Sequence, residues 1–275
     1  MSVDPARMTP GVRALFAPYL ARIGTRRRED PPDIPELNAM AASAPVVPRT
    51  AGGSAIRFIP AGGMPAADYE TTILRSGAVP TRPSNWHDAF NGLVWCTFPA
   101  TKSALNASHD AQIASGAGPE RGSARDALTL FDECGALVLS SDPDWIDLLR
   151  GHAWREALFD ARSRSAARCE ILVVGHASLD ALRQPFPGLC AKVLYRQVAE
   201  AWFDQAPSLR WRAADAWLAG WLRERGETIR ARDFAPLPLL GWPGVVADSA
   251  VAAYYDDTAQ FRPRRRAGLA GLRCA

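Results

Sequence analysis

Lysine is almost absent from this chain of 275 residues. Only Lys102 and Lys192 are lysines among its 32 cationic side chains, and the others are arginines. Because Ala, Gly and Pro are abundant as well, a genome rich in G and C explains this bias. The formal net charge of +3 is too small to indicate a nucleic-acid partner by itself.

Cysteine pairs and long apolar runs are also absent. The five cysteines are odd in number and none forms a CxxC pair, which argues against a zinc ribbon and a thioredoxin-type motif. Free thiols suit a reducing compartment. No run approaches the roughly 20 apolar residues of a membrane span, and the segment around Asp4 lacks the apolar core of a secretory signal. We therefore expect a cytoplasmic protein that binds no membrane.

The composition is that of a folded protein. Hydrophobic residues make up 48% and charged residues 22%, close to the average of globular proteins. Collagen, coiled-coil arrays, disulfide-stapled mini-domains and global disorder are excluded. We expect an N-terminal helix and a Pro/Gly-rich arm over 1–54, a single globular domain over 55–265 and a basic tail over 266–275.

Periodicity and turn residues predict an α+β fold that is predominantly helical. Its small β element is a hairpin at about 127–140, with a turn at Cys134-Gly135, plus a strand at about 170–174. A helix capped by Thr9 and two helices separated by Pro99 are clear helical signals. The predicted helices are 9–23, two within 84–114, 144–162, one capped by Ser178, 189–204 and 208–225.

Polar side chains fall on the apolar face of the helix that precedes Pro99. At about 100° per residue, His87 and Asn91 lie within an arc of aromatic and aliphatic side chains, and Asp88 lies at the edge of that arc. A buried polar group without a partner costs about 1–3 kcal/mol, so these side chains need partners.

The following helix repeats the pattern. Lys102, Asn106 and His109 share one face with the large apolar residues of that helix. If the two helices pack together, these three residues converge with His87 and Asn91. The cluster is then either an active site, since perturbed pKa values gather at functional sites, or a structural network that fixes the register of the helices.

Two further regions carry candidate residues. Asp132 and Glu133 lie at the end of a predicted strand, where they could ligate a metal or pair with Arg125. His176 follows a strand and Gly175, in a strand-to-helix turn of the kind that often holds catalytic side chains. A divalent metal is therefore a candidate cofactor, although the ligands are far apart in the sequence. The side chains considered for zinc or iron are His87, Asp88, His109, Asp132 and His176.

An arginine run, Arg262-Pro263-Arg264-Arg265-Arg266, lies near the end of the chain. Such a run can bind phosphates, but a solvated tail is more typical, and no aromatic residues are interleaved with it. We therefore expect a small-molecule ligand rather than a nucleic acid. The oligomeric state is not indicated.

Several blocks resemble a bacterial family known only as a domain of unknown function, DUF3025. They include Asn85–Trp95 (NWHDAFNGLVW), Gly175-His176-Ala177 and residues 236–244 (PLPLLGWPG). The resemblance extends over roughly 55–265 and implies a bacterial protein without implying an activity. Relatives carry Glu in the helix after the Gly-His pair, whereas Asp180 is the nearest acidic residue here.

Two functions are compatible with these patterns. The first is a hydrolase for a small or phosphate-bearing substrate, with a histidine as general base, a lysine that stabilises negative charge and asparagines that orient the substrate. The second is a non-catalytic binding or assembly protein whose polar cluster is sealed in the core. The candidate catalytic residues are His87, Asp88, Asn91, Lys102, Asn106, His109, Asp132 and His176.

Overall fold

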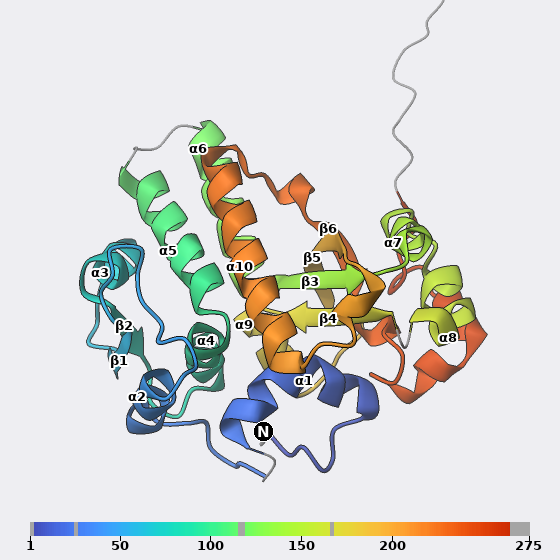
Figure 1. The fold of residues 1–275 in the computed structure, drawn as a ribbon, viewed down its shortest axis with the longest axis horizontal. Coiled ribbons are helices and arrows are strands. Elements are labelled where there is room, and N and C mark those ends of the chain that lie inside the picture. Colours follow the sequence, from blue (N-terminus) through green and yellow to red (C-terminus); the bar gives the residue numbers. More distant parts are fainter. Residues whose placement is uncertain (1–2, 25–26, 115–118, 166–167, 265–275) are drawn as a thin grey trace, which may run out of the picture.

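The structure is a computed structural model that describes residues 3–24, 27–114, 119–165 and 168–264. It confirms an α+β fold that is predominantly helical, with a four-stranded sheet at its centre (Figure 1). The α-helices are α1 (Pro10–Ile23), α2 (Ile34–Ala42), α3 (Tyr69–Ser76), α4 (Trp86–Thr97), α5 (Pro99–Ala114), α6 (Pro119–Cys134), α7 (Pro143–Arg150), α8 (Arg162–Ser165), α9 (His176–Leu182) and α10 (Pro207–Arg225). The strands are β1 (Arg57–Pro60), β2 (Ala78–Thr81), β3 (Gly135–Ser140), β4 (Cys169–Val173), β5 (Cys190–Gln197) and β6 (Ala235–Pro238).

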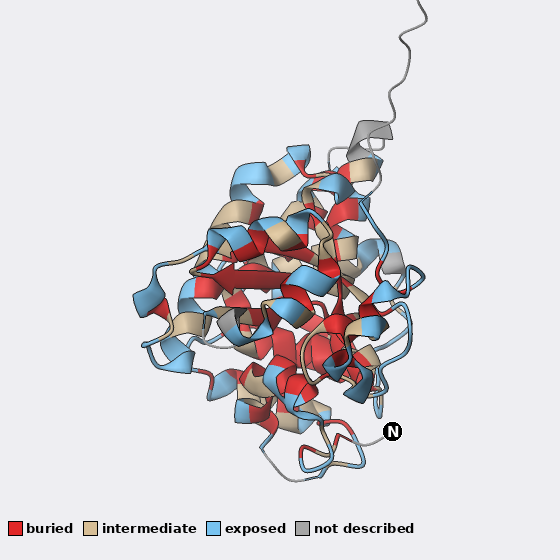
Figure 2. Cartoon of the chain, turned by 90° about the vertical axis from the view of Figure 1, so that its right-hand side faces the viewer, coloured by how far each residue is buried: buried red, intermediate tan, exposed pale blue. Residues whose placement is uncertain are grey.

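The central sheet has the strand order β4-β3-β5-β6. Strand β3 pairs parallel with β5 and antiparallel with β4, and β6 pairs antiparallel with β5. All six residues of β3 are buried, so the strand reads as a continuous apolar run rather than as an alternating one. Figure 2 shows buried residues gathered in the middle of the molecule, with exposed residues around them.

Helices surround the sheet. Figure 1 shows α4, α5 and α6 on one side of the sheet and α7 and α8 beyond its opposite end. Helix α4 packs on α9 and α1, while α5 packs on α6 and α10. Helix α1 also contacts β4, and its Thr9 side chain caps it by accepting from the Val12 amide, as predicted. The segment before residue 56 therefore contributes to the core.

The predicted hairpin at 127–140 is wrong in its first half. Residues up to Cys134 belong to α6, and β3 begins at the next residue, Gly135, without a turn. Ala127, Leu128 and Phe131 are fully buried at helical spacing. Their i, i+1, i+4 pattern fits a helix, and the short apolar run alone did not distinguish this helix from a strand.

The predicted helix over 189–204 is also wrong, because residues 190–197 form β5. Its partners β3 and β6 lie more than 35 residues away along the chain, so no local signal marks it as a strand. The helix predicted to start at Ser178 begins at His176, with Gly175 as its N-cap. The helix predicted over 144–162 ends early, at Arg150, and His152 then adopts a φ of 60°.

Part of the predicted organisation falls outside the described residues. Arg265, Arg266 and the basic tail over 266–275, with Cys274, belong to that part. Among the helices that the structure does describe, none has the length and apolar character needed to cross a bilayer.

Candidate functional site

Two glycines bring the end of α6 against the start of α9. The amides of Val174 and Gly175 both donate to the Gly135 carbonyl, over 2.9 and 2.8 Å. A Cβ atom on Gly175 would lie 2.5 Å from the Glu133 carbonyl oxygen, closer than any real side chain approaches. Only glycine permits this contact, and it places His176 next to Glu133.

His87 reaches the same place from α4. It is the second residue of that helix, which Asn85 caps by accepting from the Asp88 amide over 3.0 Å. Because α4 packs on α9, the Nε2 atoms of His87 and His176 lie 3.1 Å apart, and their rings meet edge to face. Two histidines that are 89 residues apart in the sequence therefore form one pair.

Glu133 completes a triangle with the two histidines. Its Oε1 lies 3.5 Å from His176 Nε2, and its Oε2 lies 3.8 Å from His87 Nε2. A tetrahedral metal with bonds of about 2.0–2.2 Å holds its ligand atoms about 3.3–3.6 Å from one another. The three side chains can therefore hold one divalent cation with small movements, and among the described residues they form the one such cluster of three.

The protonation states of this cluster suit a metal. Burial, and then the neighbouring His176, lowers the pKa of His87. Burial opposes ionisation of Glu133, but contact with His176 and His87 outweighs it and lowers the pKa of that carboxyl group. At neutral pH a neutral imidazole thus faces a carboxylate, and these are the forms that bind metal ions.

Asp132 points away from Glu133 into the interior. Its Oδ1 accepts from Lys102 Nζ over 2.6 Å, and its Oδ2 lies 3.8 Å from His176 Nδ1. Lys102 is buried and lies over the ring of Trp95. Burial alone would raise the pKa of Asp132, but Lys102 and then His176 outweigh it and lower the pKa to about 2.

His109 and Asn106 lie farther back along α5. With Lys102 and Asp132 they line an internal cavity of about 10 Å³, which is room for about one water molecule. The Asn106 amide nitrogen donates to the backbone carbonyl and the carboxylate of Glu70, over 2.9 and 2.7 Å. This part of the cluster is an enclosed polar network.

Asn91 and Asp88 are engaged elsewhere. Asn91 donates to the Tyr69 hydroxyl over 3.1 Å. Both oxygens of Asp88 bind Arg82, with the Arg82 side chain at 2.7 and 3.0 Å and its backbone amide at 2.7 Å. Neither side chain belongs to the triangle of His87, Glu133 and His176.

A family model matches residues 56–265, and its description is a protein of unknown function, DUF3025. The chain belongs to this family. All three donors of this DUF3025 member, His87, Glu133 and His176, fall within the matched region. No curated protein and no solved structure matches the chain.

The eight candidate residues thus divide into three groups. His87 and His176 meet at the triangle with Glu133, while Lys102, Asp132, Asn106 and His109 lie behind it. Asn91 and Asp88 hold neighbouring segments. Sequence reasoning missed Tyr69 and Glu70 as partners of the asparagines, because helix α3, which carries both, was not among the predicted helices.

Asp180 is a further carboxylate beside the site of this DUF3025 member. It lies one turn beyond His176 on α9, and its charge acts on His87. Arg183 holds Asp180 Oδ1 with two hydrogen bonds of 2.8 and 2.6 Å, and its guanidinium group stacks over Trp86, the first residue of α4. The spacing of Asp180 from Gly175-His176 was the only sequence signal for it.

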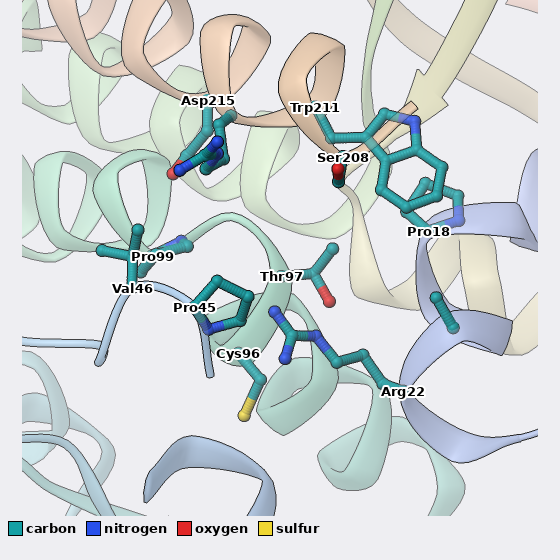
Figure 3. A pocket seen from close by; sticks show the side chains of 12 residues that line it. Pro18, Arg22, Pro45, Val46, Cys96, Thr97, Pro99, Ser208, Trp211 and Asp215 are labelled. Atoms are coloured by element: carbon teal, nitrogen blue, oxygen red, sulfur yellow. The ribbon is translucent and has the colours of Figure 1, made fainter. Parts of the chain in front are cut away.

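A separate hollow of about 330 Å³ lies at the opposite end of α4 (Figure 3). Its lining includes Cys96 and Asp215, but burial raises the pKa of the Cys96 thiol to about 12, so this thiol is a poor nucleophile. The Asp215 carboxylate accepts three hydrogen bonds from Ala100 and Thr101 at the start of α5. The histidine pair is therefore a better candidate for an active site than this hollow.

Proposed function

We propose that the protein is a metal-dependent hydrolase whose ion is held by His87, His176 and Glu133. One observation carries the proposal: two imidazole nitrogens and a carboxylate converge from three separate helices, with spacings of 3.1, 3.5 and 3.8 Å. Two histidines and one glutamate form the ligand set of several hydrolytic zinc enzymes. A divalent ion held there would lower the pKa of a bound water molecule towards about 7.

The accessibility of the triangle supports catalysis over a sealed structural network. The side chains of His87 and Glu133 are 34% and 37% exposed, whereas that of His176 is 6% exposed. One side of the triangle thus faces solvent. The opposite side is anchored in the core, which keeps the donor atoms in place.

Asp180 is the residue that we assign to proton transfer. It stands outside the triangle, so it is free of the role of a ligand. Arg183 fixes its orientation through Oδ1. Its charge acts on His87, and a carboxylate in such a position can accept a proton from water during hydrolysis.

We also propose that the protein works in the bacterial cytoplasm. Cys96, Cys134 and Cys190 carry free thiols, which suits a reducing compartment.

Metal analysis tests the proposed function most directly. Protein purified without chelators should contain about one zinc, iron or other divalent ion per chain, and chelation followed by readdition should remove and restore hydrolysis of 4-nitrophenyl phosphate or 4-nitrophenyl acetate. His87→Ala and Glu133→Gln should lose the ion. His152→Asn is the matched control, because His152 lies at a distance on the surface and Asn tolerates its φ of 60°.

The outcomes separate the two functions. Ion binding of equal strength in the parent and in His87→Ala would refute the metal site. Absence of any bound ion, together with a loss of about 1–3 kcal/mol of stability in His87→Ala, would favour the non-catalytic binding or assembly protein.

A further inference from the structure

His176 has one ring nitrogen for each of two neighbours. Its Nε2 belongs to the triangle with His87 and Glu133. Its Nδ1 is buried and has no hydrogen-bond partner among the described residues. Buried polar atoms in proteins are nearly always hydrogen-bonded, so an unpaired ring nitrogen at this position calls for an explanation.

The polar atom that faces this nitrogen is Asp132 Oδ2, 3.8 Å away. An approach of somewhat less than 1 Å would bring the pair within the usual hydrogen-bond distance of about 2.7–3.2 Å. The other oxygen of the same carboxylate is already bound to Lys102 Nζ over 2.6 Å. Asp132 therefore stands between a buried ammonium group and the back of the histidine ring.

We infer that Asp132, held by Lys102, is a positioning residue that orients His176 as a metal ligand. The inference rests on the proposed function. When Nε2 binds a metal, the ring proton resides on Nδ1, and Nδ1–H donates to Asp132 Oδ2. Ligating histidines commonly donate their second N–H to a carboxylate in this way, which fixes the tautomer and strengthens the ligand.

Lys102 accounts for the geometry of the carboxylate. Its side chain is 6% exposed and passes over the ring of Trp95. The Lys102 ammonium group donates to Asp132 Oδ1, and this leaves Asp132 Oδ2 facing His176. The polar face of α5 carries no metal ligand. It therefore influences the orientation of His176 only through the ion pair of Lys102 with Asp132.

Asp88 offers a matched comparison. Like Asp132, it is a carboxylate next to a ligand in the sequence, and it is bound by a cationic side chain, Arg82, at 2.7 Å. Unlike Asp132, it has both oxygens engaged by Arg82. Removal of its charge should therefore leave the orientation of the ligand histidines unchanged.

Cobalt titration of metal-free protein, followed by its visible absorption, tests this inference. Asp132→Asn should bind Co²⁺ about 10–100-fold more weakly than the parent, which is the usual effect of losing such a carboxylate. Asp88→Asn should bind within about threefold of the parent. Equal affinity of parent and Asp132→Asn would overturn the inference, whereas failure of the parent itself to bind Co²⁺ would overturn the proposed function.

A second measurement does not depend on how well Asp132→Asn folds. In zinc-loaded parent protein labelled with ¹⁵N-histidine, His176 should show a slowly exchanging Nδ1–H proton that is absent from the metal-free protein. A zinc-loaded His176 with its proton on Nε2, or with no protected N–H, would overturn the inference.

Discussion

Asp132 and Glu133 are consecutive residues in the last turn of α6, yet they occupy opposite environments. Glu133 faces two histidines, and its side chain is 37% exposed. The Asp132 side chain is 17% exposed and faces a buried lysine. One helical step of about 100° separates a carboxylate that can reach solvent and a metal from one that is held in the core.

This comparison shows that two adjacent carboxylates are not interchangeable. The open side supplies donor atoms, while the closed side supplies a fixed hydrogen-bond acceptor. Their roles follow from what the neighbouring helices place opposite each of them, α4 and α9 for Glu133 and α5 for Asp132.

Glu133→Gln should give the largest effect. The amide replaces a charged ligand of the triangle with a neutral one. The affinity for Zn²⁺ or Co²⁺ should therefore fall further than in Asp132→Asn, for which a loss of about 10–100-fold is expected. The melting temperature of the metal-free protein should change little, because the side chain is partly exposed. Isothermal titration gives the affinity, and an affinity loss smaller than that of Asp132→Asn would reverse the roles of the two carboxylates.

Lys102→Ala should strongly destabilise the fold. It leaves the buried Asp132 without its cation, and breaking a buried ion pair costs about 3–5 kcal/mol. Urea unfolding measures this loss in the metal-free protein. The double variant Lys102→Met with Asp132→Leu should recover much of the stability, but its metal affinity should stay about 10–100-fold below that of the parent. Recovery of both the stability and the affinity would contradict the contrast between the two carboxylates.

Asp180→Asn extends the comparison to a third carboxylate. The variant should keep its metal and its hydrogen bonds from Arg183 through the remaining oxygen, but its kcat for a 4-nitrophenyl substrate should fall by about 10²–10⁴. Metal content serves as the internal control. An unchanged kcat would remove Asp180 from proton transfer.

Gly175→Ala tests the contact that joins both carboxylates to α9. Its Cβ would lie 2.4 Å from the Gly135 amide nitrogen and 2.5 Å from the Glu133 carbonyl oxygen, so the two segments must separate. We expect a loss of about 1–3 kcal/mol in unfolding free energy together with weaker metal binding. Gly220→Ala is the control, since no atom lies near a Cβ at that position of α10. Similar stability of both variants would show that the end of α6 and the start of α9 can separate at little cost in free energy.

His87→Ala should have the smallest effect on stability. Its side chain is 34% exposed, so the unfolding free energy should fall by less than about 1 kcal/mol while metal binding is lost. Thermal unfolding in chelator provides the measurement. A loss of about 1–3 kcal/mol would instead identify His87 as part of a structural network.

The local part of this architecture could be predicted from the sequence. Caps and apolar periodicity located α1, α4, α5 and α10, and the positions of Lys102, Asn106 and His109 on a buried face of α5 are confirmed. The strand β4 was also predicted, because its apolar run is short and bounded.

The long-range part could not be predicted. The composition of residues 127–132 predicts a strand, whereas these residues belong to α6, and this error placed Asp132 and Glu133 at a strand end. The meeting of His87 with His176 depends on the packing of α4 on α9, which no residue spacing encodes. The candidate residues were thus named individually, but their partners required the topology.

The three donors lie on segments separated by more than 40 residues each, so the unfolded chain presents no ready-made site. Ion binding is therefore coupled to folding by mass action. At a free ion concentration of 1,000 times the dissociation constant, such coupling adds about 4.1 kcal/mol to the stability of the folded state. If the proposed ion binds, its supply in the cell therefore contributes to the stability of the folded chain.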